Sequence, residues 1–213
     1  MTERTVEDRL REEYVVLLPE IRAVVEESEA EIRHSLVSLS SKLNRYEQLS
    51  VTSRVKDCES AMQALRRREE GATFDPGKIN SYTLTSIPDL AGVRVLAFPS
   101  RVWNQADELL QKRFTDWRSN PILDAETKDL VAFKYDRYWT ASTKFRGELQ
   151  IVPMLIGLFW QVEHSTMYKP SPELKGVAEA LEMQHRRSEV SNALRAYEAE
   201  FERLIQANPL SKA

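Results

Sequence analysis

The segment IPDLAGVRVLAF, residues 87–98, constrains the fold of this chain most strongly. Its mainly apolar residues predict a buried β-strand over 92–98. A second segment, FRGELQIV at 145–152, also predicts a strand by its β-propensity and alternation. Each strand carries a carboxylate, because Asp89 stands at the entrance of the first and Glu148 lies within the second. The sequence therefore raises the question of why carboxylates stand in two of its most apolar segments.

Helical and strand patterns surround these two segments. Apolar residues recur at steps of three and four from Leu10 to Tyr46, which predicts two helices or one bent helix. The remaining expected elements are a helix at 100–114, strand sequence at 129–142, a mostly buried helix at 153–169 and a final helix at roughly 173–206. The order helix, strand, helix, strands, helix predicts an α+β fold, with helices packed on a mixed sheet and helical arms at both ends.

Composition narrows the range of functions. The 30 basic and 33 acidic residues give a formal net charge of -3, so no overall field attracts nucleic acid or an anionic membrane. Cys58 is the one cysteine, which excludes an internal disulfide and favours a reducing compartment. The start, MTERTVEDRLREE, lacks an apolar signal core, and the longest apolar stretch, IVPMLIGLFW, is too short to span a bilayer. We expect a cytoplasmic protein with no membrane partner.

The two carboxylates point to a divalent cation. Alternation places Glu148 and Gln150 on the same face of their strand. A buried carboxylate must be paired, protonated or bound to a cation, and carboxylates on adjacent strands repel unless a positive charge lies between them. Mg²⁺ suits this role, because it takes a few carboxylates and fills its other positions with water and phosphate oxygens. The alternative is an ordinary strand glutamate that is solvated or salt-bridged.

A basic segment precedes the first strand. Arg54, Lys56 and the run 66–68 face only Asp57 and Glu59 within fifteen residues. If this segment is extended, Arg54 and Lys56 share a face, where a guanidinium fork and an ammonium can bind phosphate oxygens. Ser60 is a candidate cap of the following helix and offers its hydroxyl. The alternative is a solvated charged loop.

Three segments in this order resemble the RelA/SpoT synthetase domain, which makes the alarmones (p)ppGpp. The family's motifs are R-x-K-x-x-x-S, D-[IL]-A-G-[IV]-R and E-[IL]-Q-I-R-T, the last followed by a helix with W-x-x-x-E-H and a nearby Y-K. The corresponding segments of this chain are RVKDCES, IPDLAGVRVLAF and ELQIVPMLIGLFWQVEHSTMYK. The amino-terminal helical pattern is also similar to the arm of the small synthetases. The resemblance covers about residues 10–170 and implies a helical arm at 1–50, a synthetase domain at 51–170 and a carboxy-terminal helix at 171–213.

The resemblance implies a fold and a reaction. The fold would be the mixed sheet of the nucleotidyltransferase-like RelA/SpoT synthetase type. The activity would be that of a GTP pyrophosphokinase, which moves the β,γ-pyrophosphate of ATP to the 3′-hydroxyl of GDP or GTP and releases AMP. ATP and a guanine nucleotide would be the partners, in a bacterial stringent response. A homo-oligomer formed through the helical arms is a further expectation from the resemblance.

The resemblance also assigns roles to single residues. Asp89 and Glu148 would hold Mg²⁺ on the donor ATP, and Asp89 would help to take the hydroxyl proton. Gln150 completes the catalytic set, and His164 would lie near the site. The residues expected to contact the ATP phosphates or base are Arg54, Lys56 and Ser60.

The acceptor motif of the family, G-Y-x-S-x-H, is not recognisable in this chain. Its nearest counterpart is KYDRYW, in which Tyr135 aligns with the tyrosine that stacks on the acceptor guanine. Lys134 then replaces the glycine and Trp139 replaces the histidine, while Tyr138 is a rival for the stacking role. Donor and metal residues therefore match the family better than acceptor residues do.

Three functions are compatible with these departures. The first is a small alarmone synthetase with an altered acceptor pocket. The second is a toxin-type relative that pyrophosphorylates the 3′ end of tRNA or makes adenosine alarmones, with tRNA the less favoured partner. The basic stretch HRRSE at 185–189 is compatible with it, although a solvated helix face explains that stretch more simply. The third is a catalytically inactive homologue that binds nucleotide or a partner protein.

Overall fold

The computed structural model describes residues 4–124, 128–138, 146–164 and 172–207. Its centre is a mixed sheet in the order β1-β2-β6-β5-β3, with β4 paired to β5 off this path. The strands are β1 (Gln48–Val55), β2 (Ala91–Phe98), β3 (Arg118–Ser119), β4 (Ile122–Leu123), β5 (Leu130–Tyr138) and β6 (Arg146–Pro153). β2 and β6 are parallel, and the other pairs are antiparallel. The predicted mixed sheet is confirmed.

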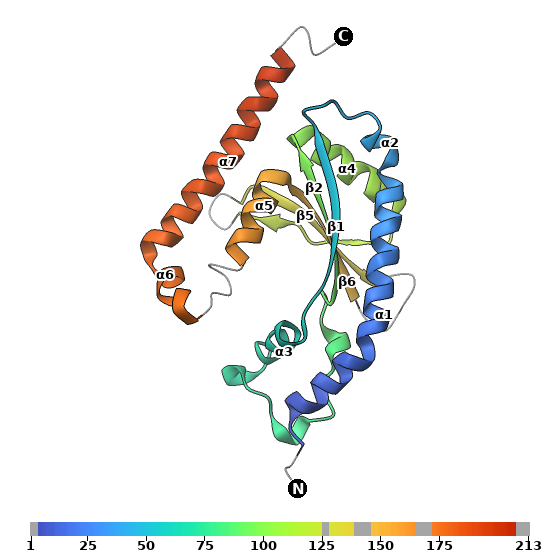
Figure 1. The fold of residues 1–213 in the computed structure, drawn as a ribbon, viewed down its shortest axis with the longest axis vertical. Coiled ribbons are helices and arrows are strands. Elements are labelled where there is room, and N and C mark those ends of the chain that lie inside the picture. The colour runs from blue at the N-terminus through green and yellow to red at the C-terminus, as the bar shows by residue number, and fades with distance from the viewer. Residues whose placement is uncertain (1–3, 125–127, 139–145, 165–171, 208–213) are drawn as a thin grey trace.

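Helices cover both faces of the sheet (Figure 1). The helices are α1 (Val6–Ser35), α2 (Val37–Ser40), α3 (Cys58–Arg66), α4 (Ser100–Arg113), α5 (Met154–Glu163), α6 (Lys175–Glu179) and α7 (Leu181–Ala207). α1 and α4 pack on one face, α5 packs on the other, and α7 lies against α5. The predicted α+β class is thus confirmed. Among the described residues, no helix is both long and apolar enough to cross a membrane.

The amino-terminal helix is one continuous element of 30 residues that contains Pro19. It begins at a capping box, in which the Thr5 hydroxyl accepts from the backbone N–H of Asp8 and the Asp8 carboxylate accepts from that of Thr5. The carboxy-terminal helix differs from the single predicted helix. Ala180 has an extended backbone, which divides it into α6 and α7.

The two faces of β2 differ in chemistry. Its odd-numbered residues, from Ala91 to Ala97, belong to the main core, with α1 and α4. On the other face, Leu96 joins Val152 and Ile156 in a second, smaller core beneath α5. The rest of that face, toward the start of β2, carries polar and glycine residues. Half of one sheet face is therefore apolar and covered, and the other half is polar.

Helix α5 is less buried than the sequence predicts. Leu158 and Val162 are 47% and 61% exposed, and only Ile156, Gly157 and Glu163 are buried. The helix packs on the surface of the sheet and turns only one side toward β2 and β6, so the apolar residues on its other side stay exposed.

Gly157 is the point of closest approach between α5 and β2. A Cβ at this position would lie 2.3 Å from Cδ2 of the buried Leu96. We expect Gly157→Val to lower the free energy of unfolding by about 1–3 kcal/mol, because the new side chain displaces Leu96 from a packed core. Chemical denaturation measures this change. Gly176→Val is the matched control, since no atom lies within 4 Å of a Cβ there; an equal loss in both variants would contradict the packing argument.

Candidate functional site

The polar half of this sheet face, which we call the half-face, consists of two adjacent rows of residues on the four long strands. Strand register places the members of each row opposite one another. The row nearer the start of β2 is Arg54, Gly92, Glu148 and Asp136. The next row is Thr52, Arg94, Gln150 and Lys134. The Arg54 side chain lies across Gly92, where an added Cβ would touch its Cγ at 3.5 Å.

Glu148 is the centre of this half-face. It is only 4% exposed, and both of its carboxylate oxygens are bonded. Lys134 Nζ lies 2.6 Å from Oε2, and Gln150 Nε2 donates to Oε1 at 2.5 Å. The buried carboxylate is therefore compensated by an ammonium and oriented by an amide, as burial of a charge requires.

Arg94 fixes the orientation of Gln150. Its Nε and Nη2 donate to Gln150 Oε1 at 3.0 and 2.7 Å, so the amide nitrogen turns toward Glu148. Burial lowers the pKa of Arg94, the positive charge of Arg54 lowers it further, and Glu148 opposes both. The guanidinium stays charged at neutral pH, and it brings positive charge to the site without a direct carboxylate bond.

Asp89 lies in the turn just before β2, next to the end of β1. Lys56 Nζ is 2.5 Å from Asp89 Oδ2, and Arg54 Nη2 is 3.9 Å from the same oxygen. The backbone N–H of Lys56 also donates to the carbonyl of Leu90, which fixes the end of β1 to this turn. The structure thus brings Arg54, Lys56 and Asp89 together.

Sequence reasoning missed two site residues, Lys134 and Asp136. Both lie on β5 and face the same side as Glu148. Asp136 Oδ1 is buried without a hydrogen-bond partner among the described residues, while Oδ2 accepts from Asn120 at 3.4 Å. The alternation of KYD is the available signal, because it puts Lys134 and Asp136 on one face and Tyr135 on the other.

Three carboxylates act on the ammonium of Lys134. Burial alone would lower the pKa of Lys134, but the hydrogen bond and charge of Glu148, with the charges of Asp136 and Asp89, outweigh it. The pKa is therefore raised above its ordinary value. The charge of Asp89, in the turn before β2, therefore acts on the same ammonium that contacts Glu148.

Ser60 and His164 are not members of the two rows of strand residues. Ser60 lies in the first turn of α3, and His164 follows α5. Ser60 does not cap α3; Asp57 does, by accepting from the backbone N–H of Ser60 at 2.8 Å. The helix begins at Cys58, so Asp57 holds the N-cap position and its carboxylate satisfies a free N–H of the first turn, whereas Ser60 already lies inside that turn. His164 is an exposed residue at the carboxy-terminal end of α5.

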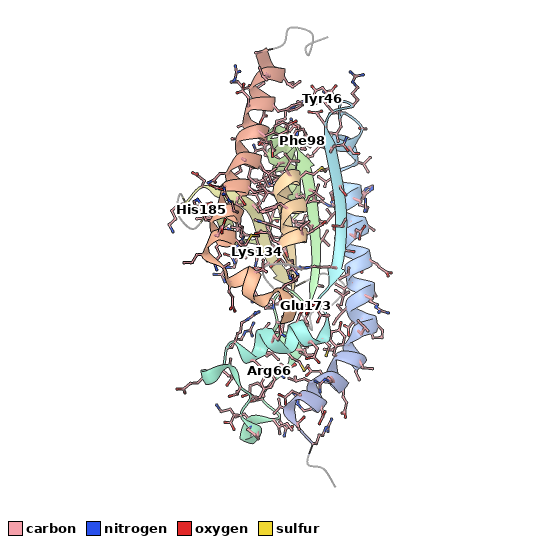
Figure 2. The ribbon with its side chains drawn as sticks, turned by 60° about the vertical axis from the view of Figure 1, so that its left-hand side comes forward. Tyr46, Arg66, Phe98, Lys134, Glu173 and His185 are labelled. Atoms are coloured by element: carbon pink, nitrogen blue, oxygen red, sulfur yellow. The ribbon has the colours of Figure 1, made fainter. Side chains whose placement is uncertain are left out.

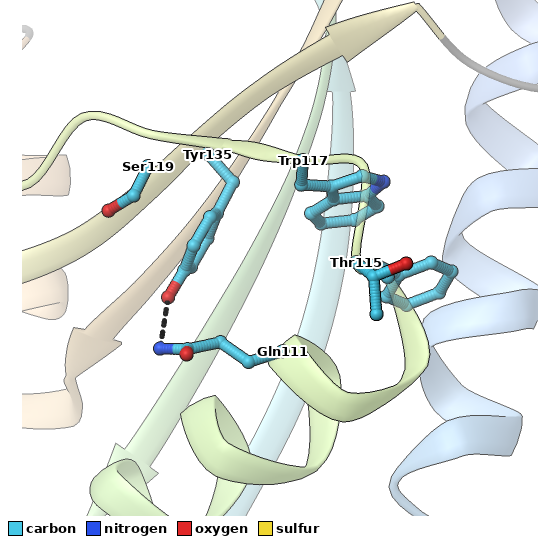
Figure 3. Close-up of a pocket in the computed structure, with 6 residues that line it drawn as sticks. Gln111, Thr115, Trp117, Ser119 and Tyr135 are labelled. Carbon is cyan, nitrogen blue, oxygen red and sulfur yellow. Dashed lines mark hydrogen bonds between the residues drawn. The ribbon is translucent and has the colours of Figure 1, made fainter.

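Tyr135 points away from this half-face. It is 5% exposed, and its hydroxyl donates to Asp107 Oδ1 at 2.5 Å. The same hydroxyl accepts from Gln111 at 2.8 Å (Figure 3), and both partners lie on α4. Burial and the negative charge of Asp107 raise the pKa of Tyr135. A cavity of about 200 Å³ adjoins it, lined by Gln111, Phe114, Thr115, Trp117, Ser119 and Tyr135. The structure therefore does not bring Tyr135 together with the other predicted site residues, and the side chain of its rival, Tyr138, lies outside the described part of the chain.

We expect Tyr135→Phe to act on stability rather than on catalysis. Loss of the hydroxyl removes the donor to Oδ1 of the buried Asp107, while Gln111 still donates to Oδ2; the free energy of unfolding should fall by about 1–3 kcal/mol. Tyr46→Phe is the control, since the Tyr46 hydroxyl accepts only a 3.4 Å hydrogen bond from the exposed Asn44 among the described residues. Denaturant titration and turnover are measured on both variants. A tenfold loss of turnover at unchanged stability would instead place Tyr135 at the substrate.

The described residues contain no group of three or more His, Cys, Asp or Glu side chains arranged to hold a metal by themselves. The half-face instead offers carboxylates on neighbouring segments, with basic side chains beside them. That donor set is compatible with a hard cation that takes one or two protein carboxylates and completes its shell with water and phosphate oxygens. The buried, unbonded Oδ1 of Asp136 adds another oxygen of the same kind.

No protein-family model matches the chain, and no curated protein matches it by sequence. Solved structures do match. A GTP pyrophosphokinase family protein from Streptococcus pneumoniae aligns with a TM-score of 0.64 and 21% identity, over 92% of this chain and 93% of its own. The small alarmone synthetase 1 from Bacillus subtilis aligns with a TM-score of 0.63 and 19% identity, over 91% and 97%. The same protein bound to its product pppGpp gives 0.62 and 20%, over 91% and 96%. This chain therefore has the RelA/SpoT-like fold of the small alarmone synthetases.

Proposed function

We propose that this protein transfers the β,γ-pyrophosphate of ATP to the 3′-hydroxyl of GDP or GTP. The observation that carries the proposal is the polar half-face, where Asp89 and the buried Glu148 are joined to Lys56 and Lys134 by contacts of 2.5 and 2.6 Å. The fold supports it, because the B. subtilis protein with the same fold is bound to its product pppGpp. Agreement of Asp89, Glu148 and Gln150 with the family's motifs supports it further.

Mg²⁺ is the cofactor that we propose for this site, held by Asp89 and Glu148. When bound, it supplies Lewis-acid charge that neutralises the phosphate oxygens of ATP. The fit rests on the donor set, which consists of carboxylate oxygens only, and on Oδ1 of Asp136, a buried oxygen without a hydrogen-bond donor among the described residues.

The other residues of the half-face have separate binding and positioning roles. Arg54 and Lys56 bind phosphate oxygens of the donor, as a guanidinium fork and a point charge. Gln150 is a positioning residue, since it contacts Glu148 and is itself fixed by Arg94. The acceptor hydroxyl oxygen attacks the β-phosphorus and gives up its proton, for which Asp89 is the proposed acceptor. The bond between the β-phosphorus and the bridging oxygen of the α-phosphate breaks, and AMP leaves with that oxygen. Positioning and charge neutralisation carry most of the rate enhancement in this kind of transfer.

One observation favours a second acceptor class. Tyr135, the residue that aligns with the guanine-stacking tyrosine, is buried on the opposite face of the sheet and bonded to Asp107. Loss of a base stack removes about 1–3 kcal/mol of acceptor binding. An adenosine nucleotide or the 3′ end of tRNA is therefore the alternative acceptor, and an inactive nucleotide-binding homologue is the non-enzymatic alternative.

A single labelling experiment separates these functions. The purified protein is incubated with γ-labelled ATP, Mg²⁺ and GDP, GTP, AMP or deacylated tRNA, and the products are separated. We expect label on GDP or GTP and stoichiometric AMP. Label on AMP or tRNA instead would establish the second acceptor class. ATP binding without any labelled acceptor would refute the transferase proposal and leave the non-catalytic homologue.

We further propose a homo-oligomer formed through the helical arms. Along α7, apolar side chains recur every seven residues and are exposed in the single chain: Met183, Val190, Tyr197 and Leu204 are 38%, 41%, 60% and 53% exposed. A stripe of this spacing lies on one side of a helix and is typical of helix pairing. Light scattering coupled to size exclusion should give a multiple of the 24.6 kDa chain mass, and a monomer at micromolar concentration would contradict the proposal.

A further inference from the structure

Lys134 is the residue of the half-face that neither the donor motifs nor the acceptor motif explains. The family's acceptor motif has glycine at the corresponding position. Lys134 lies in the middle of β5, and Figure 2 labels it on the sheet. Its side chain is 22% exposed, so the ammonium is neither fully in solvent nor sealed in the core. An ammonium kept partly buried among carboxylates needs a function or a compensating contact.

The contacts of Lys134 are those that a bound cation would make. Its Nζ lies 2.6 Å from Oε2 of Glu148. Register places Asp136 directly opposite Glu148, so two carboxylates on adjacent strands would repel each other without a positive charge nearby. The other oxygen of Glu148 is held by Gln150. A divalent cation that binds Glu148 therefore has to displace the Lys134 ammonium or bind close to its positive charge.

Lys56, unlike Lys134, is not the sole basic neighbour of its carboxylate among the described residues. It neutralises Asp89 at the edge of the half-face, where Arg54 also approaches the same carboxylate. Asp89 thus keeps a basic neighbour when one is removed. Glu148 is 4% exposed and has an ammonium contact only from Lys134 among the described residues. Removal of Lys134 therefore leaves the buried Glu148 without a basic side chain in direct contact among the described residues.

We propose that the Lys134 ammonium is a built-in counter-ion of Glu148 that competes with the divalent cation for this carboxylate. The inference rests on the proposed function, because it takes Glu148 as a metal ligand. Without nucleotide, Lys134 occupies the carboxylate and keeps metal affinity low. When the metal arrives with a nucleotide, the phosphate oxygens offer Lys134 a new anionic partner, so the ammonium moves from Glu148 to phosphate without leaving the site. Lys134 therefore couples metal binding to nucleotide binding.

The test measures Mn²⁺ binding by electron paramagnetic resonance, in the full chain without nucleotide. We expect Lys134→Met to bind Mn²⁺ at least about tenfold more tightly than the unaltered protein, because a cationic charge a few ångströms from the metal has been removed. Methionine is one atom shorter than lysine and removes the charge together with the N–H donors, while it keeps the unbranched apolar stem. Lys134→Arg, which keeps the charge, should stay within about threefold of the unaltered protein. The matched control is Lys112→Met on the exposed surface of α4, which should change nothing.

Two results would overturn the proposal. The first is equal or weaker Mn²⁺ binding by Lys134→Met, including no binding by either protein. The second is tighter binding that persists when Glu148→Gln is added to Lys134→Met, since the metal would then lie elsewhere. If Lys134→Met does not fold cooperatively, Lys134→Gln gives the same charge change with an amide that can still donate to Glu148. Tighter Mn²⁺ binding without pyrophosphate transfer in any protein would uphold this inference and refute the proposed function.

Discussion

Glu148→Gln is expected to reduce pyrophosphate transfer at least about a thousandfold while the protein stays folded. The substitution removes one negative charge and one metal-binding oxygen at the centre of the half-face. Loss of the several kcal/mol of charge stabilisation that a bound metal supplies corresponds to about three orders of magnitude in rate. Glutamine keeps the shape of the side chain and can still accept from Lys134, so the cost in stability should be only about 1–3 kcal/mol.

Initial rates with saturating ATP and acceptor measure this effect, and circular dichroism checks the fold. Glu108→Gln is the control, because Glu108 is exposed on α4, which packs on the opposite sheet face. It should retain full activity. Turnover of Glu148→Gln within tenfold of the unaltered protein would remove Glu148 from the metal site.

Asp89→Asn is expected to reduce transfer about a hundredfold to a thousandfold, with a higher Mg²⁺ requirement. Asp89 is more accessible than Glu148, with 22% of its side chain exposed, and it also orders Lys56 at 2.5 Å. The substitution therefore weakens the metal site and releases a phosphate-binding ammonium at the same time. An asparagine oxygen still ligates a metal weakly, so raised Mg²⁺ should restore part of the rate.

A Mg²⁺ titration of the rate distinguishes this outcome from general damage. The exposed Asp116→Asn, beyond the end of α4, is the control and should titrate like the unaltered protein. If Asp89→Asn loses rate with an unchanged Mg²⁺ midpoint, Asp89 acts on the nucleotide or the proton and not on the metal.

The sequence predicts the two central strands and the shared face of Glu148 and Gln150, while the roles assigned to the donor residues stay predictions. The apolar run before Phe98 and the alternation around Glu148 define β2 and β6, which the structure pairs in parallel. Local patterns suffice here because strand hydrophobicity and side-chain alternation are short-range properties. The same alternation correctly puts Glu148 and Gln150 on one face, where they are bonded to each other.

The acceptor side could not be predicted by aligning a single motif. Tyr135 matches the family's tyrosine in sequence, yet the register of β5 against β6 pairs it with Leu149, on the core side. The same register turns Lys134 and Asp136 toward Glu148. Register between strands depends on long-range pairing, which the local sequence does not encode. The exposed side of α5, at Leu158 and Val162, likewise depends on which elements lie above it.

A crystal structure with Mg²⁺ and the non-hydrolysable ATP analogue AMPCPP tests the central claim most directly. The account predicts one Mg²⁺ ion bound by carboxylate oxygens of Asp89 and Glu148 and by analogue phosphates, with Lys56 on a phosphate oxygen and Lys134 moved off Glu148. An analogue bound elsewhere, or Glu148 still held by Lys134 with no metal beside it, would contradict the account.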